Sequence, residues 1–172
     1  MPTLKAHDEE SLCHPPDRPW RIGTASGASA AALARLVRLS ITRGCVEDHG
    51  DHPVLLRTWL RNKTGTQFAA WIADPLLHCV AVGEANAMLG FAMASRSQVL
   101  LCYVHPAKFS QGIGRALMQA IETRALTSGL SHLSLQSTRT ARGFYLRQGF
   151  LPAGAAPDKS GLEGQSMLKQ LR

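Results

Sequence analysis

Three apolar segments in the middle of the chain constrain the fold more than any other feature. Residues 77–84, 88–95 and 98–104 are rich in apolar side chains, and only short turns separate them. Apolar runs of this length, joined this closely, predict an antiparallel meander of strands. Alternation is weak in residues 98–104, so we expect that strand to be covered on both faces.

Helical patterns flank this meander on both sides in the sequence. Apolar side chains recur every three or four residues after Ser29 and again over residues 112–127, which is typical of amphipathic helices. Residues 44–53, GCVEDHGDHP, are expected to form a turn-rich loop. Shorter helices are predicted over residues 55–60, 66–73 and 138–148, and further strands over residues 21–25, 133–137, 150–153 and 166–171. This mixed order predicts a three-layer α/β (α+β) domain around one sheet.

The length and composition are those of a single globular domain. The chain has 172 residues, of which 45% are hydrophobic and 18% charged. We expect a flexible leader over residues 1–19, which carry several prolines, acids and histidines, and one domain over residues 20–172. No window has the ~20 apolar residues of a membrane span, and the leader lacks the apolar core of a secretory signal. The chain is therefore expected to be cytoplasmic, with no membrane partner.

The net charge and the cysteines exclude fewer classes of function than the length and hydropathy do. The formal net charge is +7, but the basic residues are scattered and the chain has only 3 Trp, 2 Tyr and 5 Phe, so no nucleic-acid partner is expected. The four cysteines have no zinc or redox spacing and are expected to be reduced thiols. The sequence leaves a homodimer open.

A glycine pair opens the strongest helical pattern. Gly112 and Gly114 stand at its start, and the first carboxylate, Glu122, comes well inside it. A helix start has unpaired N–H groups and partial positive charge, so glycines there can form a cradle for an anion. Lys108 and Arg115 flank the pair and favour a phosphate-containing ligand. In the alternative reading, Ser110 caps the helix and the glycines only turn the chain.

A second block, over residues 137–150, places Tyr145 on a short helix that follows a strand. On its position alone, Tyr145 reads as a buried core tyrosine. Taken together, however, the two blocks resemble the GCN5-related N-acetyltransferase (GNAT) family. Val104-x-Pro106 with Gly112-Ile113-Gly114 and Ala116-Leu117 is similar to its acyl-CoA motif, and Ala141-x-x-Phe144-Tyr145-x-x-x-Gly149-Phe150 to its later helix signature.

The resemblance covers roughly residues 20–172 and implies a fold, a reaction and a cosubstrate. The fold is a mostly antiparallel mixed sheet with helices on both faces. The reaction transfers an acetyl group from acetyl-CoA to an amine by direct attack, without a covalent enzyme intermediate. Tyr145 resembles the general acid that protonates the departing thiolate. The implied coenzyme A contacts are Cys102, Tyr103, Val104, Phe109, Ser110, Gln111, Gly112, Ile113, Gly114 and Arg115.

One position departs from the family pattern. The acyl-CoA motif begins with Gln or Arg, and that place falls on Phe109 here, while Gln111 comes two places late. Gln98, at the start of the last meander strand, cannot act as a base. The departures keep a second function open, a non-catalytic coenzyme A-binding module.

The acceptor is expected to be a primary amine of a small molecule or a peptide. The family commonly builds its acceptor pocket from the region that here holds Glu47, Asp48 and His49, with Trp59 close by, and a base is sought there as well. The same region has four side chains of the kinds that bind metals: Asp48, His49, Asp51 and His52. The sequence shows no further ligand elsewhere in the chain at a spacing typical of metal sites. We therefore prefer to interpret this segment as a solvated polar turn, and no metal is expected.

Overall fold

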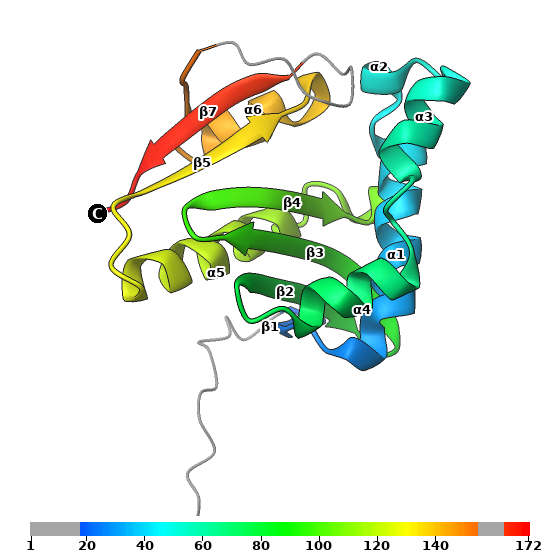
Figure 1. Ribbon diagram of the computed structural model, residues 1–172, viewed down its shortest axis with the longest axis horizontal. Helices are drawn as coiled ribbons and strands as arrows, with labels where there is room; N and C mark the ends of the chain where they lie inside the picture. Colours follow the sequence, from blue (N-terminus) through cyan, green and yellow to red (C-terminus); the bar gives the residue numbers. More distant parts are fainter. Residues whose placement is uncertain (1–17, 155–163) are drawn as a thin grey trace, which may run out of the picture.

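A seven-stranded sheet forms the middle layer of the structure, a computed structural model that describes residues 18–154 and 164–172 (Figure 1). The strand order is β1-β2-β3-β4-β5-β7-β6. The strands are β1 (Arg21–Thr24), β2 (Leu77–Glu84), β3 (Ala87–Ser95), β4 (Gln98–Val104), β5 (His132–Ser137), β6 (Leu151–Pro152) and β7 (Gln165–Gln170). The predicted α/β fold is confirmed. Residues 1–17 of the predicted leader lie outside the described residues.

The predicted meander forms the first half of the sheet. Strands β1 to β4 pair antiparallel in sequence order. Leu100 is one extra residue on β4, because Leu101 pairs with Met93 and Val99 with the next residue, Ala94. Such a bulge leaves the backbone groups of the extra residue outside the ladder.

The sheet opens in the middle, between β4 and β5. These two strands run parallel, but they pair only through Gln98 with Ser134 and Val99 with Leu135. Beyond these pairs β5 and β7 diverge from β4, as Figure 1 shows. The β4 edge from residue 100 to residue 104 is therefore left without a strand partner on its β5 side.

Helices cover the two faces of the sheet. The helical elements are η1 (Gly27–Ser29), α1 (Ala30–Leu39), η2 (Ser40–Gly44), α2 (Val46–His49), α3 (Pro53–Leu60), α4 (Gly65–Ala73), η3 (Pro106–Lys108), α5 (Ile113–Thr127) and α6 (Arg139–Arg147). One core joins α5 and α6 to the sheet and contains Val82, Leu117 and Tyr145. The other joins α1 and α4 to the opposite face and contains Leu33 and Phe91. Each face thus has its own core, as a three-layer domain requires.

The segment expected to be a turn-rich loop is instead mostly helical. Helix α1 continues into a π-helical turn at η2, α2 follows at once, and α3 begins at Pro53. Gly50 and Pro53 are residues of this segment that are typical of turns. Gly50 is the left-handed C-cap of α2, and Pro53 is the first residue of α3, where proline needs no N–H partner. Both residues mark helix boundaries here.

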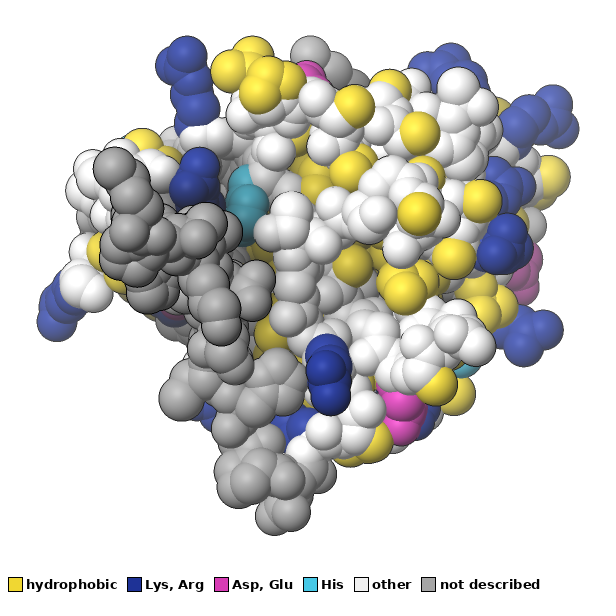
Figure 2. Space-filling model, turned by 90° about the horizontal axis from the view of Figure 1, so that it is seen from below, with side chains coloured by type: hydrophobic (Ala, Val, Ile, Leu, Met, Phe, Trp, Pro, Cys, Tyr) yellow, Lys and Arg dark blue, Asp and Glu magenta, His cyan; other side chains and the backbone are white. Residues whose placement is uncertain are grey.

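The basic side chains do not gather into one patch on the face seen in Figure 2. Most Lys and Arg side chains lie along its edges, a few lie inside the outline, and hydrophobic side chains lie between them. Within residues 18–154 and 164–172, no helix is long and apolar enough to cross a membrane.

Candidate active site

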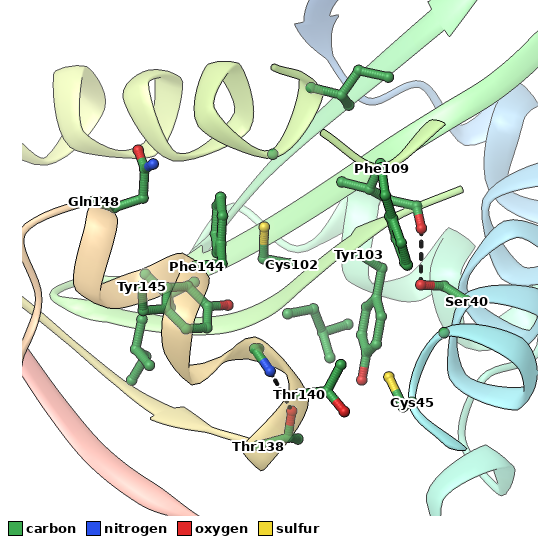
Figure 3. A pocket seen from close by; sticks show the side chains of 18 of the residues that line it. Ser40, Cys45, Cys102, Tyr103, Phe109, Thr138, Thr140, Phe144, Tyr145 and Gln148 are labelled. Carbon is green, nitrogen blue, oxygen red and sulfur yellow. Dashed lines mark hydrogen bonds between the residues drawn. The ribbon is translucent and has the colours of Figure 1, made fainter. Parts of the chain in front are cut away.

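A cavity of about 580 Å³ lies where β4 and β5 separate. Its walls come from η2, β4, the start of α5, β5 and α6 (Figure 3). All the coenzyme A contacts implied by the resemblance line it except Gln111, and so do Tyr145 and Trp59. Segments far apart in the sequence therefore meet where β4 and β5 separate.

The edge of β4 presents free backbone groups to this cavity. His105 donates its N–H to Leu89, so the alternating antiparallel ladder turns the backbone groups of Cys102 and Val104 away from β3. The Val104 carbonyl accepts a hydrogen bond of 2.9 Å from the Ser40 hydroxyl. The backbone N–H groups of Cys102 and Val104 remain directed toward the opening. This edge can pair with an extended ligand as another strand would.

The N-terminus of α5 is open toward the cavity. Its N-cap is Gly112, with φ of +80°, a conformation that glycine adopts without steric cost. No side chain caps this helix end, and its first turn has no acidic residue. Ser110 is therefore not the cap, which corrects the alternative reading. The unpaired N–H groups of the first turn and the helix dipole together favour an anion here.

The two glycines of this turn have different roles. A Cβ at Gly114 would lie 3.1 Å from the ring edge of Phe144, so this glycine allows α5 and α6 to approach closely. Gly112 instead supplies the left-handed turn. Of the two flanking cations, Lys108 forms an ion pair of 3.3 Å with Glu84, and its charge is largely compensated. Arg115 lines the cavity.

Phe109, the residue that departs from the family pattern, packs against η2. A Cβ at Gly44 would lie 2.9 Å from the tip of the Phe109 ring. The ring also lines the cavity (Figure 3). This position therefore contributes an apolar wall, and a side chain at residue 44 would displace the Phe109 ring.

Tyr145 projects from α6 into the cavity on the α5 side of the sheet (Figure 3). Thr138 caps α6 by accepting a hydrogen bond from the Ala141 N–H, at 3.3 Å. Burial, and then the neighbouring Cys102, raise the pKa of the Tyr145 phenol well above its usual value. Burial likewise raises the pKa of the Cys102 thiol to about 12, while a hydrogen bond with Tyr145 lowers it in part. Both groups hold their protons at neutral pH.

Tyr103 and Trp59 form the wall of the cavity on the opposite face of the sheet. The Trp59 indole N–H donates to the Tyr103 hydroxyl at 3.0 Å. Burial raises the pKa of Tyr103 above its usual value, and burial raises that of the nearby Cys45 thiol to about 12. This side of the cavity is aromatic and uncharged at neutral pH.

Asp48 lies directly behind this wall. No Asp or Glu among the described residues lines the cavity, but Asp48 adjoins two residues that do, Cys45 and Thr140. Its Oδ1 accepts a hydrogen bond of 3.2 Å from the Thr140 N–H at the start of α6. Its Oδ2 is buried and accepts no hydrogen bond from the described residues. A buried carboxylate oxygen without a donor is costly, so a ligand or a water molecule is expected to supply one.

Glu47 and His49 are not placed as the sequence suggested. Neither lines the cavity. His49 is 2% exposed; its Nε2 lies 3.1 Å from the Ile41 carbonyl, and its Nδ1 accepts the Asp51 N–H. Both ring nitrogens are thus used by backbone, and we leave Glu47 and His49 out of the acceptor site. No group of three or more potential metal ligands occurs in the described parts of the chain.

Several cavity residues had no functional signal in the sequence. Ser40 and Cys45 were hidden at the end of a helical pattern and in a segment read as a loop. The π-helical turn that contains Ser40 is a feature often found at functional sites, but no sequence pattern marks it. The role of Thr138 could have been predicted from the sequence, because threonine just before a helical pattern is a common N-cap.

The comparisons with known proteins agree with this geometry. Residues 45–171 match the family model described as the acetyltransferase (GNAT) domain. No curated protein matches the sequence significantly.

Three solved structures illustrate the likeness in fold. A GCN5-related N-acetyltransferase from Rhodopseudomonas palustris is 19% identical, with a TM-score of 0.78 over 92% of this chain and 100% of that one. The PaiA N-acetyltransferase from Thermoplasma acidophilum, in complex with coenzyme A, is 16% identical, with a TM-score of 0.72 over 88% and 98%. The ribosomal-protein-S18-alanine N-acetyltransferase from Escherichia coli is 18% identical, with a TM-score of 0.62 over 88% and 94%. At these identities the likeness establishes the fold alone. The family match, however, spans most of the chain, and the chain therefore belongs to the family of GNAT acetyltransferase domains.

Proposed function

We propose that this chain is an N-acetyltransferase that transfers an acetyl group from acetyl-CoA to a primary amine of a small molecule or a peptide by direct attack. One observation carries the proposal. The same cavity joins a free strand edge on β4, an uncapped helix start at α5 and a buried tyrosine on α6. These three features suit an extended chain, a diphosphate and a leaving group that needs a proton.

The residues present fit acetyl-CoA, which supplies the acetyl group as an activated thioester. The backbone of Cys102 and Val104 would hold the pantetheine arm along β4. The N–H groups around Gly112 would hold the diphosphate, and the absence of an acidic residue in the first turn of α5 favours that anion. A backbone N–H on β4 would polarise the thioester carbonyl.

Tyr145 is the proposed proton donor. The acceptor nitrogen forms a C–N bond to the acetyl carbon, the C–S bond breaks, and the Tyr145 hydroxyl gives its proton to the sulfur. An ordinary thiol has a pKa of about 8.5, which by itself would make this transfer from a phenol unfavourable. The same burial, however, raises the pKa of the adjacent Cys102 thiol to about 12. Burial thus raises the proton affinity of the sulfur as well as that of the phenol, and a thiolate that forms beside Cys102 is a stronger base there than in water.

We propose that the acceptor amine approaches from the Tyr103 side, with Asp48 as its carboxylate. The opening between β4 and β5 connects Tyr145 on one face with Tyr103 and Trp59 on the other. Asp48 Oδ2 is the buried oxygen without a donor, and because Asp48 does not line the cavity, a water molecule would link this oxygen to the amine. The carboxylate can then orient the nitrogen and accept the proton that it loses.

Asp48→Asn should lower kcat/KM for the acceptor by about 10- to 100-fold, the effect of losing one charge-assisted hydrogen bond. The affinity for acetyl-CoA should be unchanged, because the asparagine oxygen can still accept the Thr140 N–H and hold α6. Steady-state kinetics and calorimetry measure the two quantities. Asp51→Asn is the matched control, since the Asp51 side chain is 78% exposed. An equal loss in both variants, or none in Asp48→Asn, would exclude the acceptor role.

The function itself is tested by incubating the protein with acetyl-CoA and a panel of primary amines, including peptides with a free N-terminus, while free coenzyme A is followed. We expect amine-dependent release and an acetylated product by mass spectrometry. Binding of acetyl-CoA without release for any amine would favour the non-catalytic coenzyme A-binding module. Absence of binding would reject the proposal.

A further inference from the structure

The segment that precedes β1 brings a guanidinium to the start of α5. Arg18 lies against Gly112: a Cβ at Gly112 would stand 3.5 Å from both terminal nitrogens of Arg18. The guanidinium carbon lies 4.8 Å from the centre of the Trp20 ring, and Trp20 is only 6% exposed. A buried tryptophan therefore anchors the segment, and its ring stabilises the cation beside the glycine turn.

The charge of Arg18 is not compensated at this place. Arg18 has no hydrogen bond or ion pair with the described residues, whereas Lys108 in the same region is paired with Glu84. The first turn of α5 has no acidic residue. A cation at the positive end of a helix dipole is unfavourable unless an anion lies between them. The position of Arg18, although exposed to water, thus favours an external anion at the N–H groups that follow Gly112.

We propose that the Arg18 guanidinium binds the diphosphate of acetyl-CoA over Gly112. The inference rests on the proposed function, which puts the diphosphate at this turn. Arginine suits the role, because its planar fork can donate two parallel hydrogen bonds to phosphate oxygens. Phe109, where the family pattern has a polar side chain, is turned toward Gly44 and offers the diphosphate none. Arg18 lies outside the family match, which begins at residue 45, and supplies that polar contact from the other end of the chain.

The test compares acetyl-CoA affinity by calorimetry in wild type, Arg18→Gln and Arg21→Gln. Glutamine keeps a polar side chain and removes the charge, together with the guanidinium contact on the Trp20 ring. We expect Arg18→Gln to bind about tenfold more weakly, as for the loss of one charge-assisted hydrogen bond. Arg21, an exposed arginine at the start of β1, is the matched control and should change affinity by less than about twofold. Arg18→Lys should retain part of the affinity, because it keeps the charge and loses the fork.

A second ligand, 3′-dephospho-CoA, identifies the phosphate that is bound. The tenfold difference should persist with it, because it keeps the diphosphate and lacks, relative to acetyl-CoA, only the 3′-phosphate and the acetyl group. A difference that disappears with this ligand would overturn the assignment to the diphosphate. Equal acetyl-CoA affinity of wild type and Arg18→Gln, with unchanged thermal unfolding, would overturn the role of Arg18 while the proposed function stands. If wild type binds no acetyl-CoA, the proposed function fails first.

Discussion

Tyr145→Phe should lower kcat by about 10²- to 10⁴-fold, the usual contribution of a positioned general acid. The substitution removes only the hydroxyl that gives its proton to the departing sulfur and leaves the ring among Phe144 and Phe150. Acetyl-CoA affinity and the thermal unfolding midpoint should therefore stay close to those of wild type. Turnover is measured with an acceptor from the amine panel, and affinity by calorimetry.

The pH dependence gives an independent check on Tyr145. Burial raises the pKa of its phenol well above the usual value of 10.0, so the proton that it donates is still bound at pH 10. The wild-type kcat should accordingly not decline between pH 8 and pH 10 through loss of this proton.

Tyr103→Phe, which removes the acceptor of the Trp59 hydrogen bond, is the comparison variant, and its kcat should fall by less than about tenfold. An unchanged kcat in Tyr145→Phe would reduce Tyr145 to a packing residue.

Gly112→Trp should weaken acetyl-CoA binding by at least roughly 100-fold. The indole would fill the space over the first turn of α5 that the diphosphate needs, and two lost charge-assisted hydrogen bonds of about 1.5–3 kcal/mol each are enough for this loss. The substitution would also displace the Arg18 guanidinium, which lies 3.5 Å from the new Cβ. Calorimetric titration with acetyl-CoA measures the effect.

Gly129→Trp is the control for backbone strain in this experiment. Gly129 follows the other end of α5 and has a φ of +74°, close to the +80° of Gly112, with no atom within 4 Å of its Cβ position. Both variants therefore have a similar strain, of about 1–3 kcal/mol, and only one of them blocks the cradle. If Gly112→Trp binds as well as Gly129→Trp, the diphosphate does not lie at this turn.

The meander and the two motif blocks could be predicted because their signals are local. The strand predicted over residues 98–104 coincides with β4, and the helix predicted over residues 112–127 differs from α5 by one residue. Periodicity determines such elements whenever the core they face is the one that their own apolar residues form. The prediction of a loop over residues 44–53 was wrong for the opposite reason. Gly50 and Pro53 are equally suited to a loop and to helix boundaries, and only packing decides between them.

The site was predicted less completely, because several of its members are brought in by distant segments. Asp48 reaches Thr140, which is 92 residues away in the sequence, and Ser40 reaches Val104, 64 residues away. Arg18 reaches Gly112 from a segment that had been assigned to the leader. His49 shows the reverse case, since its ring looked available in the sequence but is used by backbone in the fold.

By itself, the sequence determined the family, the order of strands and helices, and the turn that opens α5, because each depends on residue types at short spacing. The tertiary structure decided which side chains share the cavity and which charges are left uncompensated. It pairs Lys108 with Glu84 and places the Arg18 guanidinium beside Gly112 without a charged partner among the described residues. It also buries one carboxylate oxygen of Asp48 without a hydrogen-bond donor from these residues. These outcomes depend on where β4 and β5 separate and on how the outer helices pack, and no local pattern encodes that geometry.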